Sequence, residues 1–410
     1  MIRGNAIVGQ SGGPTAAINA TLAGVIRGCF ASDVIDVVYG MRNGIEGLLE
    51  ERIIALDDKL CNEENLKVLE QTPAAALGSC RVKLPGVNFN GTCNNDIYIR
   101  IFDILCRYNI RYFFYIGGND SMDTVDKLNT YAKIIGYDIK IIGIPKTIDN
   151  DLAMTDHTPG FGSAAKYVAT SVREIIRDCA VYTMRTVNII EIMGRNAGWL
   201  AAASTLGRLV DGVEPDLVYV AECDFDIKSF YNDIEMAFKK HSNVVIAVSE
   251  GINIDRTSIE KSSMALDAFG HDQLAGVGKI LENAVRKHFG CKVRSIELNV
   301  AQRCAAHVLS LTDITESVFI GSQAVEVAIG GASGVMVAFE RKDGEPYSCD
   351  AVCVPVKLVA NEIKKLPSHF INKEQNNVTD ECCEYLLPLI CGEYPLVWEG
   401  GLTKHIIFEV

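Results

Sequence analysis

A lysine, a threonine and two aspartates lie close together in the segment IIGIPKTIDND, residues 141–151. They are Lys146, Thr147, Asp149 and Asp151. A cation, a hydroxyl and two carboxylates are costly to bury together unless a partner compensates for them. A phosphorylated substrate with its metal would be such a partner. A solvated turn is the alternative interpretation of this stretch taken alone.

The residues before Lys146 predict the element that positions it. An apolar run cut off by Pro145 indicates a buried strand that ends abruptly. Loops at the carboxyl ends of strands are where open parallel sheets bind ligands. The segment therefore predicts a ligand-binding loop directly after a strand.

Four further apolar runs end in the same manner, in glycine or charged residues. They are residues 111–116 before 117–121, 187–192 before 193–195, 217–221 before Glu222, and 244–249 before Glu250. After the first of these runs, apolar residues at helical spacing predict a helix over residues 121–136. This regularity predicts an α/β sheet with one ligand-binding edge.

Two loops carry weaker signals for phosphate binding. The sequence QSGGPTAAINA predicts a glycine turn and a helix with Pro14 at its first position. The backbone amides of Gly12 and Gly13 would then offer a phosphate site, although a plain tight turn fits as well. Arg81 and Lys83 in LGSCRVKLPG are either phosphate contacts or solvated charges.

Composition limits the class of protein. The 410 residues are 48% hydrophobic, which predicts a large core and two domains. A net charge of −13 argues against nucleic-acid and anionic-membrane partners. No run approaches the roughly 20 apolar residues of a membrane span, and the start of the chain leaves no room for a signal peptide. Fourteen cysteines without a CxxC pair favour reduced thiols, so we expect a cytoplasmic enzyme.

The motifs SGGPTAAINA, YIGGNDS, IPKTIDND, EIMGRNAGWLA and VSEG, in this order, resemble the phosphofructokinase family over residues 5–340. The resemblance implies two similar Rossmann-like three-layer α/β domains with the active site in the cleft between them. The implied donor-binding domain covers residues 1–160 plus about 304–355. The implied sugar-phosphate-binding domain covers residues 161–303 plus about 356–410.

The resemblance also implies residue roles. Asp149 would be the base that accepts the proton of the sugar's 1-hydroxyl, and Arg195 and Lys146 would assist the transfer. The sugar phosphate would be bound by Thr147, Ile148, Asp149, Met193, Gly194, Arg195 and Glu250, with Arg303 and Arg294 on the 6-phosphate. One such arginine would come from a neighbouring subunit, which implies a homodimer or homotetramer with shared active sites.

Two positions indicate the phosphoryl donor. ATP-using members of the family have glycine where this chain has Asp120 and Lys146. An aspartate at the first position would occupy the space of a nucleotide's α-phosphate, and a lysine at the second would add a cation at the transferred group. The chain therefore resembles the pyrophosphate-dependent branch, with Gly12, Arg81 and Lys146 expected on pyrophosphate.

The implied cofactor is Mg²⁺, with Asn119, Asp120 and Asp151 as its expected protein ligands. Asn119 replaces an aspartate that many members of the family carry. An amide oxygen is a poorer magnesium ligand than a carboxylate, so Asp120, Asp151 and the substrate phosphates would hold the metal.

Other functions stay open at this point. An ATP-dependent kinase with the same fold would leave Lys146 as a bystander. A catalytically silent sugar-phosphate-binding subunit is suggested by Asn119, whereas the presence of Asp149, Arg195 and Glu250 together argues against it. A dinucleotide oxidoreductase would need a GxGxxG motif, which the chain lacks.

Overall fold

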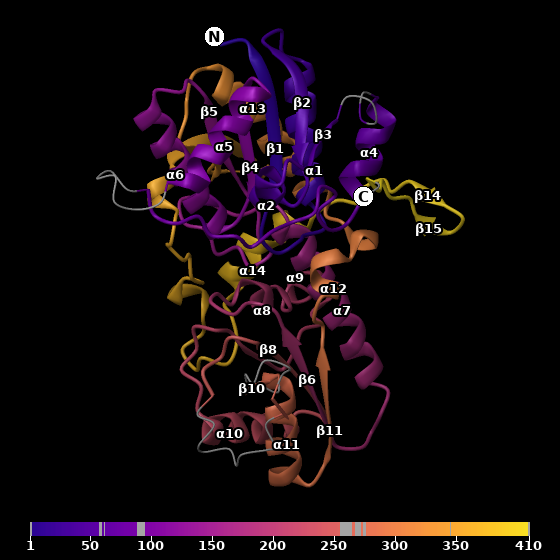
Figure 1. Cartoon of the computed structure of the whole chain (residues 1–410). Coiled ribbons are helices and arrows are strands. Elements are labelled where there is room, and N and C mark those ends of the chain that lie inside the picture. Colours follow the sequence, from indigo (N-terminus) through magenta and orange to yellow (C-terminus); the bar gives the residue numbers. More distant parts are fainter. Residues whose placement is uncertain are drawn as a thin grey trace. The chain divides into compact units, whose positions relative to one another are not determined.

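The computed structural model describes residues 2–56, 60, 62–87, 95–254, 265–266, 272–273, 276–344 and 346–408. The chain forms two compact units (Figure 1). The first contains Met1–Ser163, Arg303–Ile363 and Cys391–Val410, and the second contains Ala164–Gln302 and Lys364–Ile390. Among the described residues, no helix has the length and apolar character that a membrane crossing requires.

The last twenty residues belong to the first unit, whereas the sequence assigned residues 356–410 to the second domain. Hydrogen bonds explain the difference. Gln71 Nε2 donates to the backbone oxygens of Val397 and Lys404, at 2.8 Å each. The buried Gln71 thereby holds the end of the chain against the first unit.

The first unit is built on a seven-stranded sheet in the order β13-β12-β5-β4-β1-β2-β3. Its strands are β1 (Gly4–Gln10), β2 (Ile35–Met41), β3 (Ile53–Ala55), β4 (Ile110–Gly117), β5 (Lys140–Pro145), β12 (Val335–Arg341) and β13 (Cys349–Pro355). The five central strands are parallel, and the edge strands β3 and β13 are antiparallel to their neighbours.

Helices cover both faces of this sheet, as alternation along the strands requires. Ala6 and Val8 face a core shared with α1 (Ile18–Phe30), α4 (Glu63–Gln71) and α13 (Leu311–Ile329). Ile7, between them, faces a core shared with α2 (Gly44–Leu49), α5 (Asp96–Arg107) and α6 (Asn119–Ile135). The first unit is therefore a three-layer α/β structure, as expected.

Helices α1 and α13 approach each other closely through glycine. A methyl group built on Gly24 would lie 2.1 Å from Val318 O, and one built on Gly321 would lie 2.3 Å from Thr21 O. Distances this short exclude any side chain at either position. The two helices, nearly 300 positions apart in sequence, therefore pack backbone against backbone.

The second unit has a four-stranded parallel sheet in the order β11-β6-β8-β7. Its strands are β6 (Thr186–Ile192), β7 (Leu217–Tyr219), β8 (Asn243–Ser249) and β11 (Lys292–Glu297). Its helices are α7 (Phe161–Cys179, which begins in the first unit), α8 (Trp199–Ala203), α9 (Arg208–Asp211), α10 (Ile227–Phe238), α11 (Val277–Phe289) and α14 (Asp380–Leu386). Apolar residues of β6, β8, α10 and α11 form its core.

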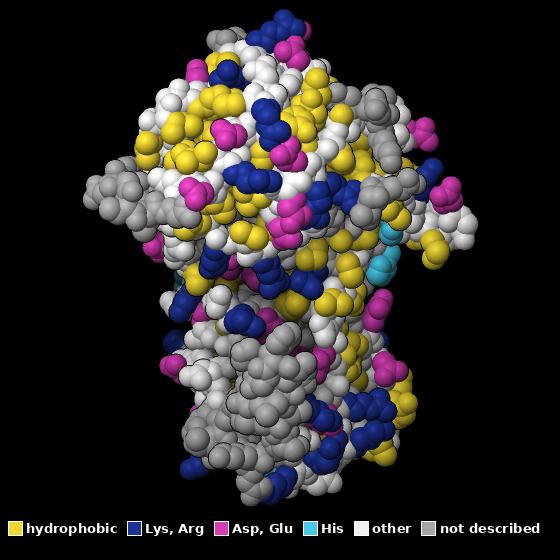
Figure 2. All heavy atoms as spheres, viewed as in Figure 1, with side chains coloured by type: hydrophobic (Ala, Val, Ile, Leu, Met, Phe, Trp, Pro, Cys, Tyr) yellow, Lys and Arg dark blue, Asp and Glu magenta, His cyan; other side chains and the backbone are white. Residues whose placement is uncertain are grey.

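The remaining elements are short. They are β9 (Ala265–Leu266), β10 (Asp272–Gln273), β14 (Trp398–Glu399), β15 (Leu402–Thr403), α12 (Ala301–Cys304), η1 (Ala306–Val308), η2 (Val356–Leu358), η3 (Ser368–Phe370) and η4 (Leu387–Ile390). In the upper part of the view in Figure 2, Lys and Arg side chains are interspersed with Asp and Glu side chains.

Two expectations about the elements were wrong. The predicted strands belong to two sheets, each with its own carboxyl edge, rather than to a single sheet. The first helix begins at Ile18 and not at Pro14. A helix starting at Pro14 would use the carbonyl of Gly13 to accept the first helical N–H. That carbonyl accepts a hydrogen bond from Lys146 Nζ instead.

Candidate active site

The glycine turn Gly12–Gly13 lies where three parallel strands end side by side. The strand order reverses between β1 and β4, because β2 lies on one side of β1 while β4 and β5 lie on the other. Ser11 N donates to Ile116 O at 2.9 Å, and Lys146 N donates to Gly117 O at 3.0 Å. The loops after β1, β4 and β5 are therefore neighbours, at the place where open parallel sheets bind ligands.

Lys146 is a buried cation among these loops. Its side chain is 2% exposed, and Nζ donates to the Gly13 carbonyl at 2.5 Å. Burial lowers the pKa of Lys146 to about 8. The charges of Asp149 and Asp151 oppose this shift. A lysine with so strongly perturbed a pKa marks a candidate functional site that suits an anion.

Two arginines approach the same turn. A methyl group built on Gly13 would lie 3.5 Å from Arg303 Nη1. The buried Arg303 Nε has no hydrogen-bond partner among the described residues. Arg81 is exposed and lies on the loop whose Ser79 Oγ donates to Gly12 O at 2.6 Å. One lysine and two arginines around a single turn suit an anion that carries several negative charges.

Arg303 is the residue at which the chain returns to the first unit, directly after Gln302 of the second. Its charge acts on Lys146 together with that of Arg81. The resemblance implied that Arg303 holds the sugar 6-phosphate, and this role stays a prediction.

The amide of Gly12 does not have the phosphate-binding role that the sequence predicted for it. Its N–H donates to Cys80 O at 3.1 Å, so this amide is not available to a phosphate. Its φ of +78° is a conformation that glycine adopts without strain. A methyl group there would lie 3.3 Å from Lys146 Nζ. Gly12 thus makes the turn and leaves room for the lysine.

The carboxylates Asp149 and Asp151 lie on the loop after Lys146. Asp149 N donates to Thr147 Oγ1 at 3.1 Å, and Thr158 Oγ1 donates to Thr147 O at 2.8 Å. Both carboxylates are half-buried. Their oxygens are suitable ligands for a hard divalent cation, and either one is a suitable proton acceptor. Ile148, between Thr147 and Asp149, is 5% exposed, so its side chain is buried, and the expected sugar contact at this residue would have to come from its backbone.

Asn119 and Asp120, at the start of α6, have different surroundings. Asp120 Oδ1 lies 2.8 Å from Lys83 Nζ, and the two side chains are 63% and 68% exposed. Asn119 Nδ2 donates to Glu362 O at 2.8 Å. Its Oδ1 is buried and has no hydrogen-bond partner among the described residues. This oxygen is therefore not used by the protein, and the expected role of Asn119 as a metal ligand stays a prediction.

The loops after β6 and β8 form a second group of expected site residues, in the second unit. Gly194 N lies 3.4 Å from Glu250 Oε1, and Ser249 Oγ donates to Gly194 O at 2.7 Å. Arg195 is exposed, whereas Met193 and Glu250 are half-buried. The pairing of β6 with β8 therefore brings together the motifs MGR and SEG, as expected.

Arg294 does not join this group. It pairs with Asn188 in the middle of the strands, four positions before β6 ends at Ile192. At about 3.3 Å per residue, this is about 13 Å from the strand end. Arg294 instead lines a small cavity with Cys179 and Tyr182. Within its own chain it is therefore remote from Arg195 and Glu250.

Two buried amides that support the glycine turn were missed from the sequence. Gln10 Nε2 donates to Asn19 Oδ1 at 2.8 Å, and Asn19 Nδ2 donates to Thr72 O at 2.7 Å. Leu77 N donates to Gln10 Oε1 at 2.9 Å. These bonds hold the segment that leads to Arg81. The available signal was the presence of two amide side chains in an otherwise apolar strand and helix.

Comparison with known proteins shows the family of the chain. The family model for phosphofructokinase matches residues 5–328. The pyrophosphate–fructose 6-phosphate 1-phosphotransferases of Halomonas elongata and Xanthomonas campestris are each 40% identical to this chain. The alignments cover 98% and 99% of this chain and 96% of each relative. The crystal structure of a pyrophosphate-dependent phosphofructokinase from Nitrosospira multiformis matches with a TM-score of 0.88 at 36% identity, over 98% of this chain and 95% of that one. The chain belongs to the phosphofructokinase family.

Proposed function

We propose that the protein transfers a phosphoryl group from pyrophosphate to the 1-hydroxyl of fructose 6-phosphate, reversibly, in glycolysis. The products are fructose 1,6-bisphosphate and phosphate. The observation that carries this proposal is the buried Lys146, whose charge is held with Arg303 and Arg81 around the glycine turn and next to Asp149. The names of the relatives at 40% identity support the same reaction.

Asp149 is the proposed base. Its backbone is held by Thr147, and its carboxylate lies close enough to Lys146 to influence the lysine's charge. When the sugar hydroxyl attacks phosphorus, its proton passes to the Asp149 carboxylate. Hydroxyl groups are weak nucleophiles near neutral pH, so a positioned base accelerates this step by about 10² to 10⁴.

Lys146, Arg303 and Arg81 neutralise the charge on the transferred group. Phosphoryl transfer has little covalent chemistry for the protein to perform, so positioning and charge stabilisation dominate. Lys146 is desolvated before the donor arrives, and the unpartnered Nε of Arg303 is ready to donate. These groups therefore need little rearrangement when pyrophosphate binds.

Phosphotransferases of this family use a divalent metal, and we propose Mg²⁺. Asp151, with Asp149 beside it, supplies the carboxylate oxygens that Mg²⁺ prefers. The ion would neutralise part of the charge on the phosphates and reduce their mutual repulsion. Asp120 is a weaker candidate ligand because it is paired with Lys83.

We propose that Asp120 excludes nucleotides as phosphoryl donors. Its carboxylate is largely exposed at the start of α6, where it would repel an additional phosphate. Lys83 holds this carboxylate without burying it. The proposed pyrophosphate site therefore combines the cations Lys146, Arg303 and Arg81 at the glycine turn with an anion, Asp120, at the edge of the site.

Met193, Gly194, Arg195 and Glu250 are the proposed sugar-phosphate contacts. Arg294 is too far along its strand to reach them in its own chain, which supports a homodimer or homotetramer in which Arg294 serves a neighbouring subunit's site. The cytoplasmic location stays a prediction from the sequence.

The testing experiment measures fructose 1,6-bisphosphate formation with pyrophosphate and ATP in parallel, each with Mg²⁺. We expect activity with pyrophosphate only. Asp149→Asn should reduce kcat by at least about 10². The matched control is Asp138→Asn, an exposed aspartate that precedes β5, which should leave kcat unchanged. Activity with ATP alone would contradict the donor assignment, and binding of fructose 6-phosphate without turnover would establish a binding subunit.

A further inference from the structure

His157 lies between β5 and α7 and is enclosed by two carboxylates. Its Nδ1 is 2.9 Å from Asp156 Oδ2, and its Nε2 is 2.8 Å from Glu316 Oε2. The side chain is 2% exposed, and the ring stacks on Phe339 with centroids 4.6 Å apart. A neutral imidazole donates at one nitrogen only, so the imidazolium is the form that donates to two ionised carboxylates.

The surroundings of His157 balance its charge. The groups around it are Asp156 on its own loop, Asp313 and Glu316 on α13, Arg341 on β12, and Tyr347 and Cys349 from the hairpin of β12 and β13. Arg341 Nη2 lies 3.1 Å from Asp156 Oδ2, and Tyr347 donates its hydroxyl hydrogen to Glu316 Oε1 at 2.9 Å. Besides His157 itself, one cation, Arg341, and one neutral donor, Tyr347, therefore face the two carboxylates.

Electrostatics agree with a protonated ring. Burial alone would lower the pKa of His157, but hydrogen bonds to Asp156 and Glu316 outweigh this effect and raise the pKa above 6.5. Burial raises the pKa of Asp313, which accepts hydrogen bonds from two backbone amides. It also raises the pKa of Cys349 to about 12. The thiol is therefore neutral across the physiological range.

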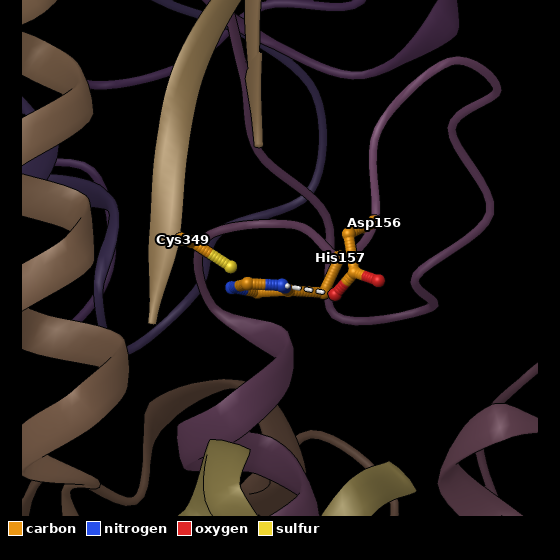
Figure 3. A group of neighbouring side chains, drawn as sticks. All are labelled: Asp156, His157 and Cys349. Atoms are coloured by element: carbon orange, nitrogen blue, oxygen red, sulfur yellow. Dashed lines mark hydrogen bonds and ion pairs between the residues drawn. The ribbon is translucent and has the colours of Figure 1, made fainter. Parts of the chain in front are cut away.

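The same cluster could be read as a metal site. The ligand atoms of Asp156, His157 and Cys349 lie within 4.8 Å of one another. Figure 3 shows the ring between the carboxylate at one end and the sulfur near the other. A metal would have to displace the proton between Nε2 and Glu316 and remove a thiol proton whose pKa is about 12. The existing hydrogen bonds therefore favour a proton over a metal.

The segment that carries His157 extends the sheet where β5 stops. β5 pairs with β12 only at Val335 and Met336. Further along the same strand, Asp156 N donates to Phe339 O at 2.9 Å, and Phe339 N donates to Thr155 Oγ1 at 3.0 Å. Residues 155–156 thus occupy the strand edge that β5 leaves open.

The same segment reaches the proposed base. Thr158, directly after His157, donates its hydroxyl hydrogen to Thr147 O at 2.8 Å. Thr147 Oγ1 in turn accepts from Asp149 N at 3.1 Å. Two hydrogen bonds, joined by the covalent chain at Thr147, therefore link the residue after the buried histidine to the backbone of Asp149.

We propose that protonated His157 is a positioning residue, which holds residues 155–158 on β12 and, through Thr158 and Thr147, fixes the backbone that presents Asp149. This inference rests on the proposed function, in which Asp149 is the base. A misplacement of about 1 Å can cost about 10² in rate. Loss of the imidazolium proton at alkaline pH removes one hydrogen bond to a carboxylate and releases this segment.

Kinetics of His157→Gln provide the first test. We expect kcat to fall about tenfold while KM for pyrophosphate changes less than about twofold, because the anion-binding cations are untouched. The matched control is His241→Gln, which removes a histidine paired with Asp216 at 2.7 Å in the second unit. It should leave kcat unchanged. A rise in KM with unchanged kcat in His157→Gln would overturn the proposal.

Glu316→Gln tests the role of the proton. Removing one carboxylate lowers the pKa of His157, so the alkaline fall in kcat should begin at a lower pH than in the wild type. This variant keeps the ring and its packing, so it decides the question even if His157→Gln does not fold. A pH profile of kcat identical to the wild type would refute the proposal.

Thr158→Val tests the path to Asp149. The variant keeps the shape of the side chain and removes the hydrogen bond to Thr147. If His157 acts through this bond, the double variant with His157→Gln should lose no more kcat than the more impaired single variant. Losses that multiply would mean that His157 acts by another route.

A nitrogen-15 NMR titration of the histidines tests the protonation state without activity. Both nitrogens of His157 should carry protons at pH 7, and the ring should titrate above its ordinary pKa of 6.5. Stabilisation by a raised histidine pKa is complete below about 6.5 and is lost as pH rises through the folded value. A neutral ring at pH 7 would refute the proposal, whereas wild-type inactivity with pyrophosphate would refute only the proposed function.

Discussion

In each unit, loops at the carboxyl ends of parallel strands carry a cation, but the two cations have opposite surroundings. In the first unit, the loops after β1, β4 and β5 enclose Lys146, which is 2% exposed. In the second unit, the loops after β6 and β8 present Arg195 to solvent beside the half-buried Glu250. The same strand-end geometry thus holds a desolvated cation in one unit and a solvated cation in the other.

This difference places the desolvation cost at different stages. Lys146 loses its water when the protein folds, so the cost reduces the stability of the fold rather than the affinity for the donor. Arg195 loses its water only when a substrate binds. The first group is therefore preorganised for transfer, whereas the second is suited to reversible binding of the sugar phosphate.

Lys146→Met should have the largest effect and gives the sharpest test of the comparison. We expect kcat/KM for pyrophosphate to fall by at least about 10², because one charge-stabilising donor is lost. The shift of the Lys146 pKa from 10.5 to about 8 corresponds to about 3 kcal/mol of charge burial. After subtraction of about 1 kcal/mol for the lost hydrogen bond, urea unfolding should show a gain of about 2 kcal/mol.

Arg195→Met is the matched control for this variant. It should reduce activity without a gain in stability, because its guanidinium is already solvated. If Lys146→Met is no more stable than the wild type, burial of the Lys146 charge does not cost the folded state more than the solvated charge of Arg195 does.

The pH dependence of the wild type tests the same lysine without a mutation. The charged form of Lys146 dominates below its pKa of about 8 and disappears above it. We expect kcat/KM for pyrophosphate, which reports the free enzyme, to fall above pH 8 by about tenfold per pH unit. Bound pyrophosphate favours the charged lysine, so the fall in kcat should occur at higher pH. A flat kcat/KM profile up to pH 10 would show that Lys146 keeps its proton.

Gly194→Ala and Gly12→Ala compare the two glycine turns. Both glycines have positive φ, but a methyl group on Gly194 would lie 2.5 Å from Ala197 O, whereas one on Gly12 would meet only Lys146 Nζ at 3.3 Å. We expect a loss of about 2 to 3 kcal/mol at Gly194 and of about 1 kcal/mol at Gly12, measured by urea unfolding. The opposite order would show that the turn in the second unit is the more adaptable one.

Lys83→Met should have the smallest effect on stability. Its ion pair with Asp120 is largely exposed, and such pairs contribute little. We expect an unchanged Tm and a kcat/KM for pyrophosphate within about threefold of the wild type. A loss comparable to that of Lys146→Met would mean that Lys83 contacts the donor directly.

Functional residues that are neighbours in the chain could be located from the sequence. Lys146, Asp149 and Asp151 follow one strand, so an apolar run and a proline were sufficient to locate them. The place of Arg303 was not predictable, because about 290 positions separate it from the glycine turn and only the fold brings them together. The role of Gln10 and Asn19 was not predicted, because no sequence pattern marks a side-chain amide that forms hydrogen bonds to the backbone.

The N–H of Gly12 fits a phosphate by residue type, but the backbone oxygen of Cys80 already accepts its hydrogen bond. At Asn119 the backbone oxygen of Glu362 accepts from Nδ2, whereas Oδ1, the atom that could bind a metal, has no hydrogen-bond partner among the described residues. Sequence patterns identify which atoms can bind a ligand, whereas only the structure shows which of them are still available.

The close packing of α1 against α13 has a consequence for synthesis of the chain. Helix α1 leaves the ribosome before residues 164–302 have been made, whereas its backbone partner at Gly321 emerges only after them. We expect residues 164–302 to fold while the apolar face of α1 is still uncovered. Slow translation before residue 330 would therefore prolong the period in which a nascent chain is open to chaperones and to aggregation.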